Sequence, residues 1–220
     1  MTYSGKTHDF LDDVLPDQDY RADIFSLVVS AWPTVKLPRG IRLEPRITGL
    51  LRLAMIQEQE TIFEPDPPFF ISEEVKKRDA VTGKEFERTD VEIHLRYCYI
   101  RGQKPYFVFE YKRLNVSYGT AVRSDAQAYV AEGGMGHLLA GGYESVPNFN
   151  GMLAYVMDGQ LAKAKDAVEK QLANKSGELQ LVGEATIQSS KLMPAGSPHG
   201  ATRHVQGAEE FQLFHLFLAV

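Results

Sequence analysis

Two charged residues, Glu110 and Lys112, stand two positions apart in an otherwise apolar segment that begins at Phe107. If this segment is a β-strand, residues at i and i+2 lie on the same face, so the carboxylate and the ammonium are neighbours. Burying such charges costs free energy unless they pair with each other, bind a metal ion or face a cleft. Glu110 and Lys112 are therefore the first candidate functional residues.

The elements that position this pair are predicted to be two strands joined by a turn, between Thr89 and Leu114. The first strand alternates the apolar residues Val91, Ile93, Leu95, Tyr97 and Tyr99 with Asp90, Glu92, His94 and Arg96. A break at 102–105 provides the turn, and the apolar pattern resumes at Tyr106. The hairpin would place Asp90 on the strand next to the one that carries Glu110 and Lys112.

An acid at the start of one core strand, followed by an acid-x-Lys pair on the next, resembles the PD-(D/E)XK nuclease superfamily. The matching positions are Asp90, Glu110 and Lys112, and Thr89 stands where the family usually has Pro. The resemblance extends from about residue 44 to the last strand. It implies an α/β fold of the restriction-endonuclease type, in which three layers (α/β/α) surround a central mixed sheet.

The resemblance also implies phosphodiester hydrolysis with Mg²⁺ or Mn²⁺. Asp90 and Glu110 would hold the ion through hard oxygen ligands, together with the backbone carbonyl of Tyr111. Lys112 would position the attacking water. Glu44, at the start of the segment Glu44-Pro-Arg-Ile-Thr-Gly-Leu-Leu, resembles a helix glutamate that several branches of the family place beside the metal, where it would bind a second ion or its waters.

Each of these roles has an alternative. Glu44 could be an acid in a first helical turn, favoured by the helix dipole. Glu92 competes with Asp90, because it lies on the same face two residues further on. Lys112 could form a salt bridge with Glu110 on an edge strand. Gln127, in a helix predicted after the Glu110 strand, could orient a water or phosphate, or could be a plain surface residue.

Composition favours one domain, residues 1–220, with an acidic N-terminal arm over about 1–19. The net charge is -5, yet residues 36–52 hold five basic residues against one acid, and 96–123 hold six against one. A locally basic face can bind phosphates, so nucleic acid, with DNA the expected polymer, is the predicted partner. A homodimer or a partner ATPase is a further possibility.

Other classes of protein are disfavoured by what the chain lacks. One cysteine, Cys98, excludes an internal disulfide and a Cys-rich zinc cluster. No apolar run reaches the ~20 residues needed to span a bilayer, and the acidic N-terminus is not a secretory signal, so a cytoplasmic location is expected. The glycine-rich run 133–136 follows a helical pattern, no Gly-x-Ser-x-Gly turn is present, and the histidines lack metal-ligand spacing. Two other functions stay open: a non-catalytic scaffold of the same fold, and a phosphodiesterase for small esters.

Periodicity predicts the remaining elements. Helices are expected at 20–32, from 44, at 120–132 and at 158–174; strands at 69–75, 151–157, 178–187 and 211–220; a polar connection at 76–88; and a long loop at 192–207.

Overall fold

The computed structural model describes residues 19–38, 43–64, 66–78, 85–96, 106–118, 121–140, 150–194, 197–207 and 209–220, and at 73–78, 85–90, 118 and 206 it describes the backbone alone. Its elements, in chain order, are α2 (Arg21–Ala31), η1 (Trp32–Thr34), α3 (Glu44–Ile62), β1 (Phe69–Arg78), β2 (Glu85–Leu95), β3 (Phe107–Leu114), β4 (Val116–Tyr118), β5 (Ala121–Arg123), α5 (Ala126–Val130), α6 (Met135–Leu139), β6 (Asn150–Val156), α7 (Leu161–Asn174), β7 (Gly200–Gln206) and β8 (Glu209–Ala219). The expected N-terminal arm, as far as residue 18, lies outside the described residues.

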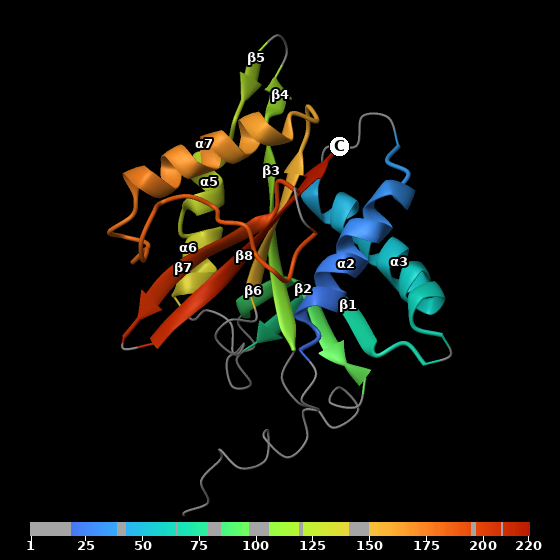
Figure 1. Cartoon of the computed structure of the whole chain (residues 1–220). Coiled ribbons are helices and arrows are strands. Elements are labelled where there is room, and N and C mark those ends of the chain that lie inside the picture. Colours follow the sequence, from blue (N-terminus) through green and yellow to red (C-terminus); the bar gives the residue numbers. More distant parts are fainter. Residues whose placement is uncertain are drawn as a thin grey trace, which may run out of the picture.

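The protein is an α/β structure built on a mixed six-stranded sheet, in the order β1-β2-β3-β6-β8-β7. Strands β3, β6 and β8 run parallel to one another, and the other neighbours pair antiparallel. Helices α2 and α3 pack on one face, and α5, α6 and α7 on the other (Figure 1). Among the described residues, no helix has both the length and the apolar character to cross a bilayer.

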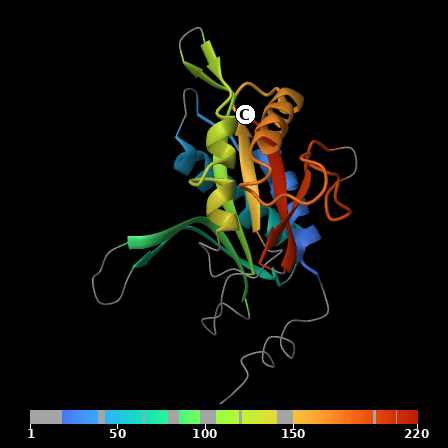
Figure 2. The same cartoon turned by 90° about the vertical axis from the view of Figure 1, so that its left-hand side faces the viewer.

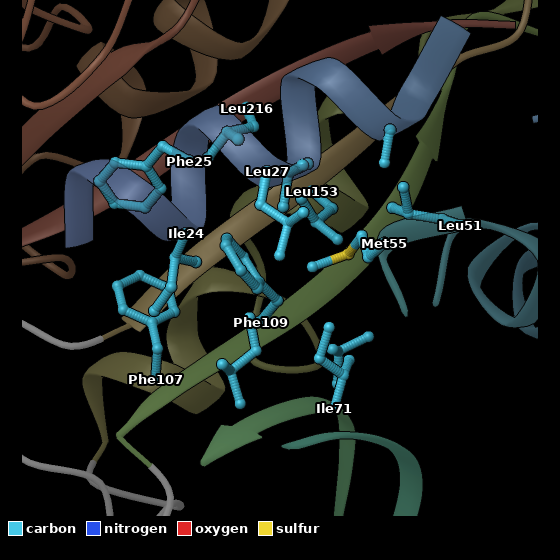
Figure 3. Close-up of a cluster of buried hydrophobic side chains, with 14 of the residues drawn as sticks. Ile24, Phe25, Leu27, Leu51, Met55, Ile71, Phe107, Phe109, Leu153 and Leu216 are labelled. Atoms are coloured by element: carbon cyan, nitrogen blue, oxygen red, sulfur yellow. The ribbon is translucent and has the colours of Figure 1, made fainter. Parts of the chain in front are cut away.

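Each face of the sheet has its own hydrophobic core. Under α2 and α3, the alternate residues Phe107, Phe109 and Tyr111 of β3 meet side chains such as Phe25 and Leu27 (Figure 3). Every residue of the central strand β6 is buried, as expected for a parallel strand covered on both sides. Gly151 in this strand lies so close to the ring of Phe109 that an added Cβ would stand 2.7 Å from its Cε1 atom. The absence of a side chain at 151 therefore leaves room over β6 for the rings of Phe107 and Phe109 from β3.

The opposite face contains a buried chain of hydrogen bonds with one possible direction. His204 Nδ1 must donate to the carbonyl oxygen of Leu179 (2.8 Å), so its Nε2 accepts the Thr202 hydroxyl proton (2.7 Å). Thr202 Oγ1 then accepts from His215 Nε2 (2.9 Å), and His215 Nδ1 accepts from the Tyr129 hydroxyl (2.9 Å). This direction holds because burial lowers the pKa of His204 and His215 and keeps both imidazoles neutral, each with one tautomer. The hydrogen bonds connect α5, β8, β7 and the turn after α7.

The buried hydrogen-bonded histidines predict that the free energy of unfolding decreases in acid. Burial lowers the pKa of His215 to about 3, and His204 and Lys165 act in the same direction. In the unfolded chain this imidazole binds a proton below about pH 6.5, whereas in the folded state it stays neutral until about pH 3. The free energy of unfolding therefore falls as pH drops from 6.5 toward 3, by up to about 1.4 kcal/mol per pH unit from this residue. Urea denaturation at pH 7 and pH 5 measures the slope.

His215→Gln should reduce that slope. Tyr129→Phe removes the hydrogen bond between Tyr129 and His215 but keeps the imidazole. It should therefore lower stability at both pH values and leave the slope against pH unchanged. An equal slope in wild type and His215→Gln would contradict the assignment.

Several expectations about secondary structure are confirmed, namely those for α2, α3, β6, α7 and β8. The predicted buried stripe of α2 is buried throughout, whereas Leu43, assigned to the stripe of α3, is 61% exposed one residue before the helix begins. The errors lie in three regions. The segment 76–88 is largely strand, because β1 and β2 extend into it. Residues 121–123 form a strand and not the start of a helix, and α5 begins only at Ala126.

The third error concerns the C-terminal part. Residues 178–187 are turns that touch β7 through isolated bridges such as Leu181 to His204, and the loop predicted at 192–207 contains β7 itself. Positive φ angles at Gln180 (49°) and Gly183 (80°) break the expected strand.

Candidate active site

Strands β2 and β3 pair over a short distance and then separate. In the described chain their antiparallel ladder runs from Ile93 opposite Phe107 to Val91 opposite Phe109. Residues 85–90 of β2 continue in pairing with β1, while residues 110–114 of β3 continue beside β6. We call the region where the two strands part, residues 85–90 and 110–114, the fork.

Glu110 and Lys112 lie at the fork on one face of β3. Lys112 Nζ donates a hydrogen bond to Glu110 Oε1 at 2.6 Å, and the two side chains are 19% and 8% exposed. The alternative of a salt bridge on an edge strand is thus met only in part: the salt bridge is present, but β3 is the third strand of the sheet and not an edge. A nearly buried ion pair inside a sheet is a poor source of stability, which leaves a functional reason for its presence.

Asp90 belongs to β2 and directly precedes Val91, the last residue of the ladder with β3. Its backbone thus enters the fork from the opposite side to Glu110. The side chain of Asp90 lies outside the described residues.

Glu44, the first residue of α3, reaches the edge of β3 at Arg113, the residue after Lys112. Its Oε1 atom accepts the backbone N–H of Arg113 at 2.8 Å and lies 3.4 Å from Nε of the same residue. An N–H on this edge of β3 would have bonded to β2 if the ladder had continued, so Glu44 takes the place of the missing strand. The acid in the first helical turn is thus used for a contact with β3, beside Lys112.

The backbone of Tyr111 faces the same edge of β3 as that of Arg113. Backbone groups of alternate residues in a strand point to the same side, and Leu114, the residue after Arg113, points to β6, where its carbonyl accepts from Met157 N (2.9 Å). The Tyr111 carbonyl is accordingly directed into the fork, while its aromatic side chain packs in the core under α3.

Glu92, the competitor of Asp90, is on the face that carries Glu110, since its backbone is opposite that of Val108. It is 3% exposed, and its Oε2 atom lies 3.2 Å from Nε2 of His94. Glu92 therefore sits within the paired part of β2, before the strands separate, and has a partner of its own.

The donor set at the fork consists of hard oxygen atoms, which suit Mg²⁺ or Mn²⁺. The described side chains contain no group of three His, Cys, Asp or Glu residues that could hold a metal ion. A cation at the fork would thus need oxygen atoms beyond those side chains, and the Tyr111 carbonyl is one that the described part of β3 directs there.

The basic residues expected to form a nucleic-acid face have divided roles. Arg52 Nε donates to the carbonyl oxygen of Ile71 (2.8 Å), so it ties α3 to β1. Arg113 is paired with Glu44, whereas Arg46, Arg96 and Arg123 are exposed. Arg39, Arg42, Arg101 and Lys104 lie outside the described residues.

The remaining candidates serve the fold. His199, in the segment that was predicted to be a loop, accepts the backbone N–H of Phe217 at its Nδ1 atom (3.1 Å), and burial lowers its pKa to about 4. Gln127 is exposed on α5. Sequence reasoning missed the hydrogen-bond chain of His204 and His215, because residues so far apart in the sequence carry no spacing signal.

No protein-family model, no curated protein and no solved structure matches this chain.

Proposed function

We propose that this protein is a metal-dependent nuclease of the PD-(D/E)XK type that hydrolyses phosphodiester bonds of DNA in the cytoplasm. The observation that carries the proposal is the Glu110–Lys112 pair, placed in an interior strand at the point where β2 and β3 separate. The mixed sheet with helices on both faces is compatible with the restriction-endonuclease fold that the motif implies.

Four groups would hold the cation and its waters: the carboxylates of Asp90, Glu110 and Glu44, and the Tyr111 carbonyl. When bound, a divalent cation supplies charge stabilisation at the phosphate and makes water more acidic. The chain's own contribution is positional. Glu110 is held by Lys112, and Glu44 is held by the Arg113 N–H, so neither carboxylate has to be ordered during the reaction.

Lys112 supplies the remaining function. Its ammonium has three donors, and one of them engages Glu110. The other two can orient an attacking water or a phosphate oxygen on the same face of β3. This role requires the ammonium to remain next to the carboxylate, which the 2.6 Å contact provides.

The test is cleavage of plasmid, linear duplex and single-stranded DNA by the purified protein with Mg²⁺ or Mn²⁺. We expect nicking or cutting with either metal and none with EDTA. Glu92→Gln is the informative variant, because it changes an acid on the same face as Glu110 but within the ladder. It should keep activity within a few-fold of wild type, since Gln retains an acceptor for His94. Loss of cleavage in Glu92→Gln would mean that Glu92, in place of Asp90, is the acid of β2 that the reaction requires.

The 2.6 Å ion pair also favours a second candidate, a non-catalytic scaffold that binds nucleic acid without cutting it. A carboxylate permanently held by lysine would bind no cation. Binding of DNA without cleavage under every metal tested would favour this function over the nuclease.

A further inference from the structure

A small hairpin leaves the main sheet just beyond the fork. Strands β4 and β5 form a two-stranded sheet of their own, and β4 begins four residues after Lys112, roughly 13 Å along the chain. Two residues in the left-handed conformation bound the hairpin, Asn115 (φ 55°) and Asp125 (φ 50°). The Asn115 N–H donates to the carbonyl oxygen of Ser124 (3.1 Å), which closes the base of the hairpin and sets its direction.

This hairpin projects from the same side of the molecule as the part of β1 and β2 that extends beyond the ladder with β3. Figure 2 shows both leaning to the left of the view, one from the top and the other from the lower half. The fork lies between them in the chain, because β2 enters it from one hairpin and β3 leaves it toward the other. A substrate long enough to pass the fork would meet the β4–β5 hairpin.

A polar pocket lies at the base of the hairpin. It has a volume of about 440 Å³ and is lined by Arg123, Ser124, Asp125, Gln127, Ala128, Ala131 and Gln171. Two amides, a hydroxyl and a guanidinium thus line one space, and all of them can donate hydrogen bonds to an anion. One carboxylate, that of Asp125, also lines it.

The Asp125 carboxylate orients Arg123. Its Oδ1 atom is in contact with Nε of Arg123, and the two side chains are 12% and 69% exposed, respectively. The nearly buried acid therefore lies against the inner nitrogen of a guanidinium whose side chain is largely exposed. A guanidinium held in this way loses little conformational entropy when it binds a phosphate with its outer nitrogens.

We propose that this pocket anchors a backbone phosphate of double-stranded nucleic acid, at a position other than the one cleaved. The inference rests on the proposed function and names its substrate class. The hairpin itself, residues 116–123, contains one arginine and no acid, which suits a polyanion. A two-stranded ribbon fits a DNA major groove about 12 Å wide.

The experiment measures binding and not cleavage. Fluorescence anisotropy with a labelled ~30-base-pair duplex in EDTA, over a series of salt concentrations, is compared for wild type, Arg123→Ala and Gln127→Ala. We expect about tenfold weaker binding for Arg123→Ala at low salt. The slope of log affinity against log salt should fall by about one, which is the loss of one phosphate contact. Gln127→Ala should weaken binding by a smaller factor.

Arg203→Ala is the matched control, since Arg203 is also exposed (52%) and paired with an acid, Glu210, but lies on the edge strand β7. It should bind the duplex as wild type does. Equal binding by wild type and Arg123→Ala, or an equal loss in Arg203→Ala, would overturn the anchor, as would a wild type that binds no duplex.

A parallel titration with the single strand separates the substrate classes. A loss in Arg123→Ala confined to the single strand would overturn the duplex assignment. Because cleavage plays no part in these measurements, a failed anchor leaves the proposed nuclease standing. A protein that binds the duplex through Arg123 but never cuts DNA would contradict the proposed nuclease function and leave the phosphate anchor intact.

Discussion

Replacing Glu110 by Gln, Lys112 by Gln or Asp90 by Asn should each lower metal-dependent cleavage by at least about a hundredfold. Loss of positioned acid–base and charge-stabilising groups in enzymes commonly has effects of ~10²–10⁴. Amide replacements are chosen because Gln keeps a hydrogen-bonding group beside the remaining buried charge, whereas Ala would leave that charge with no polar partner and destabilise the fold by about 3–5 kcal/mol.

The measurement is the initial rate of plasmid nicking in Mg²⁺, alongside the thermal midpoint of each variant. The variants should fold as wild type does and bind DNA in EDTA with similar affinity. Three variants that cut at the wild-type rate would contradict the site. A loss of cleavage accompanied by unfolding would instead identify the ion pair as structural.

The second large effect is on stability. Phe25→Ala should lower the free energy of unfolding by about 3–5 kcal/mol, the usual cost of truncating a buried Phe. Phe25 is fully buried, and its ring centroid lies 5.4 Å from that of Phe107 and 4.8 Å from that of Phe214 (Figure 3). This cost is a large part of the ~5–15 kcal/mol that stabilises an ordinary domain.

Urea denaturation at pH 7 measures the loss. Leu53→Ala, which truncates a side chain that is 52% exposed on α3, is the control and should change stability by less than about 0.5 kcal/mol. A small effect of Phe25→Ala would mean that α2 does not form part of the core.

The sheet and the fork are linked through this core. Helix α2 packs against Phe107 and α3 carries Glu44, so the same apolar layer that stabilises the domain also sets where Glu44 meets β3. We therefore expect mutations in this core to lower activity through the position of Glu44, even when they lie far from Lys112.

Local patterns in the sequence predicted the elements that carry their own periodicity. The apolar stripes of α2 and α3, the continuous apolar run of β6 and the Glu-x-Lys pair of β3 depend on residues close in the chain. The prediction failed where pairing partners are distant. The apolar residues Ala121, Ala126, Tyr129 and Val130 favoured one helix. However, residues 121–123 pair with β4, and Asp125 turns the chain before α5.

Strand β7 shows the same limit. Its sequence, Gly-Ala-Thr-Arg-His-Val-Gln, has a glycine and several polar residues and was predicted to be a loop, yet it forms a complete antiparallel ladder with β8. The polar side chains of Thr202 and His204 are buried there because His215 and Leu179 satisfy them, and such partners cannot be read from local sequence.

For the candidate site, the sequence alone determined the residue types and the spacing of Glu110 and Lys112, because a strand places i and i+2 on one face. Tertiary structure decided three further points. The strand is interior, residues 85–90 of β2 are separated from it, and Glu44 of α3 accepts the backbone N–H of Arg113. The physical reason is the range of the forces involved. Side-chain alternation is a local property of the backbone, whereas strand order and the end of a ladder depend on which distant segments bury their apolar faces together.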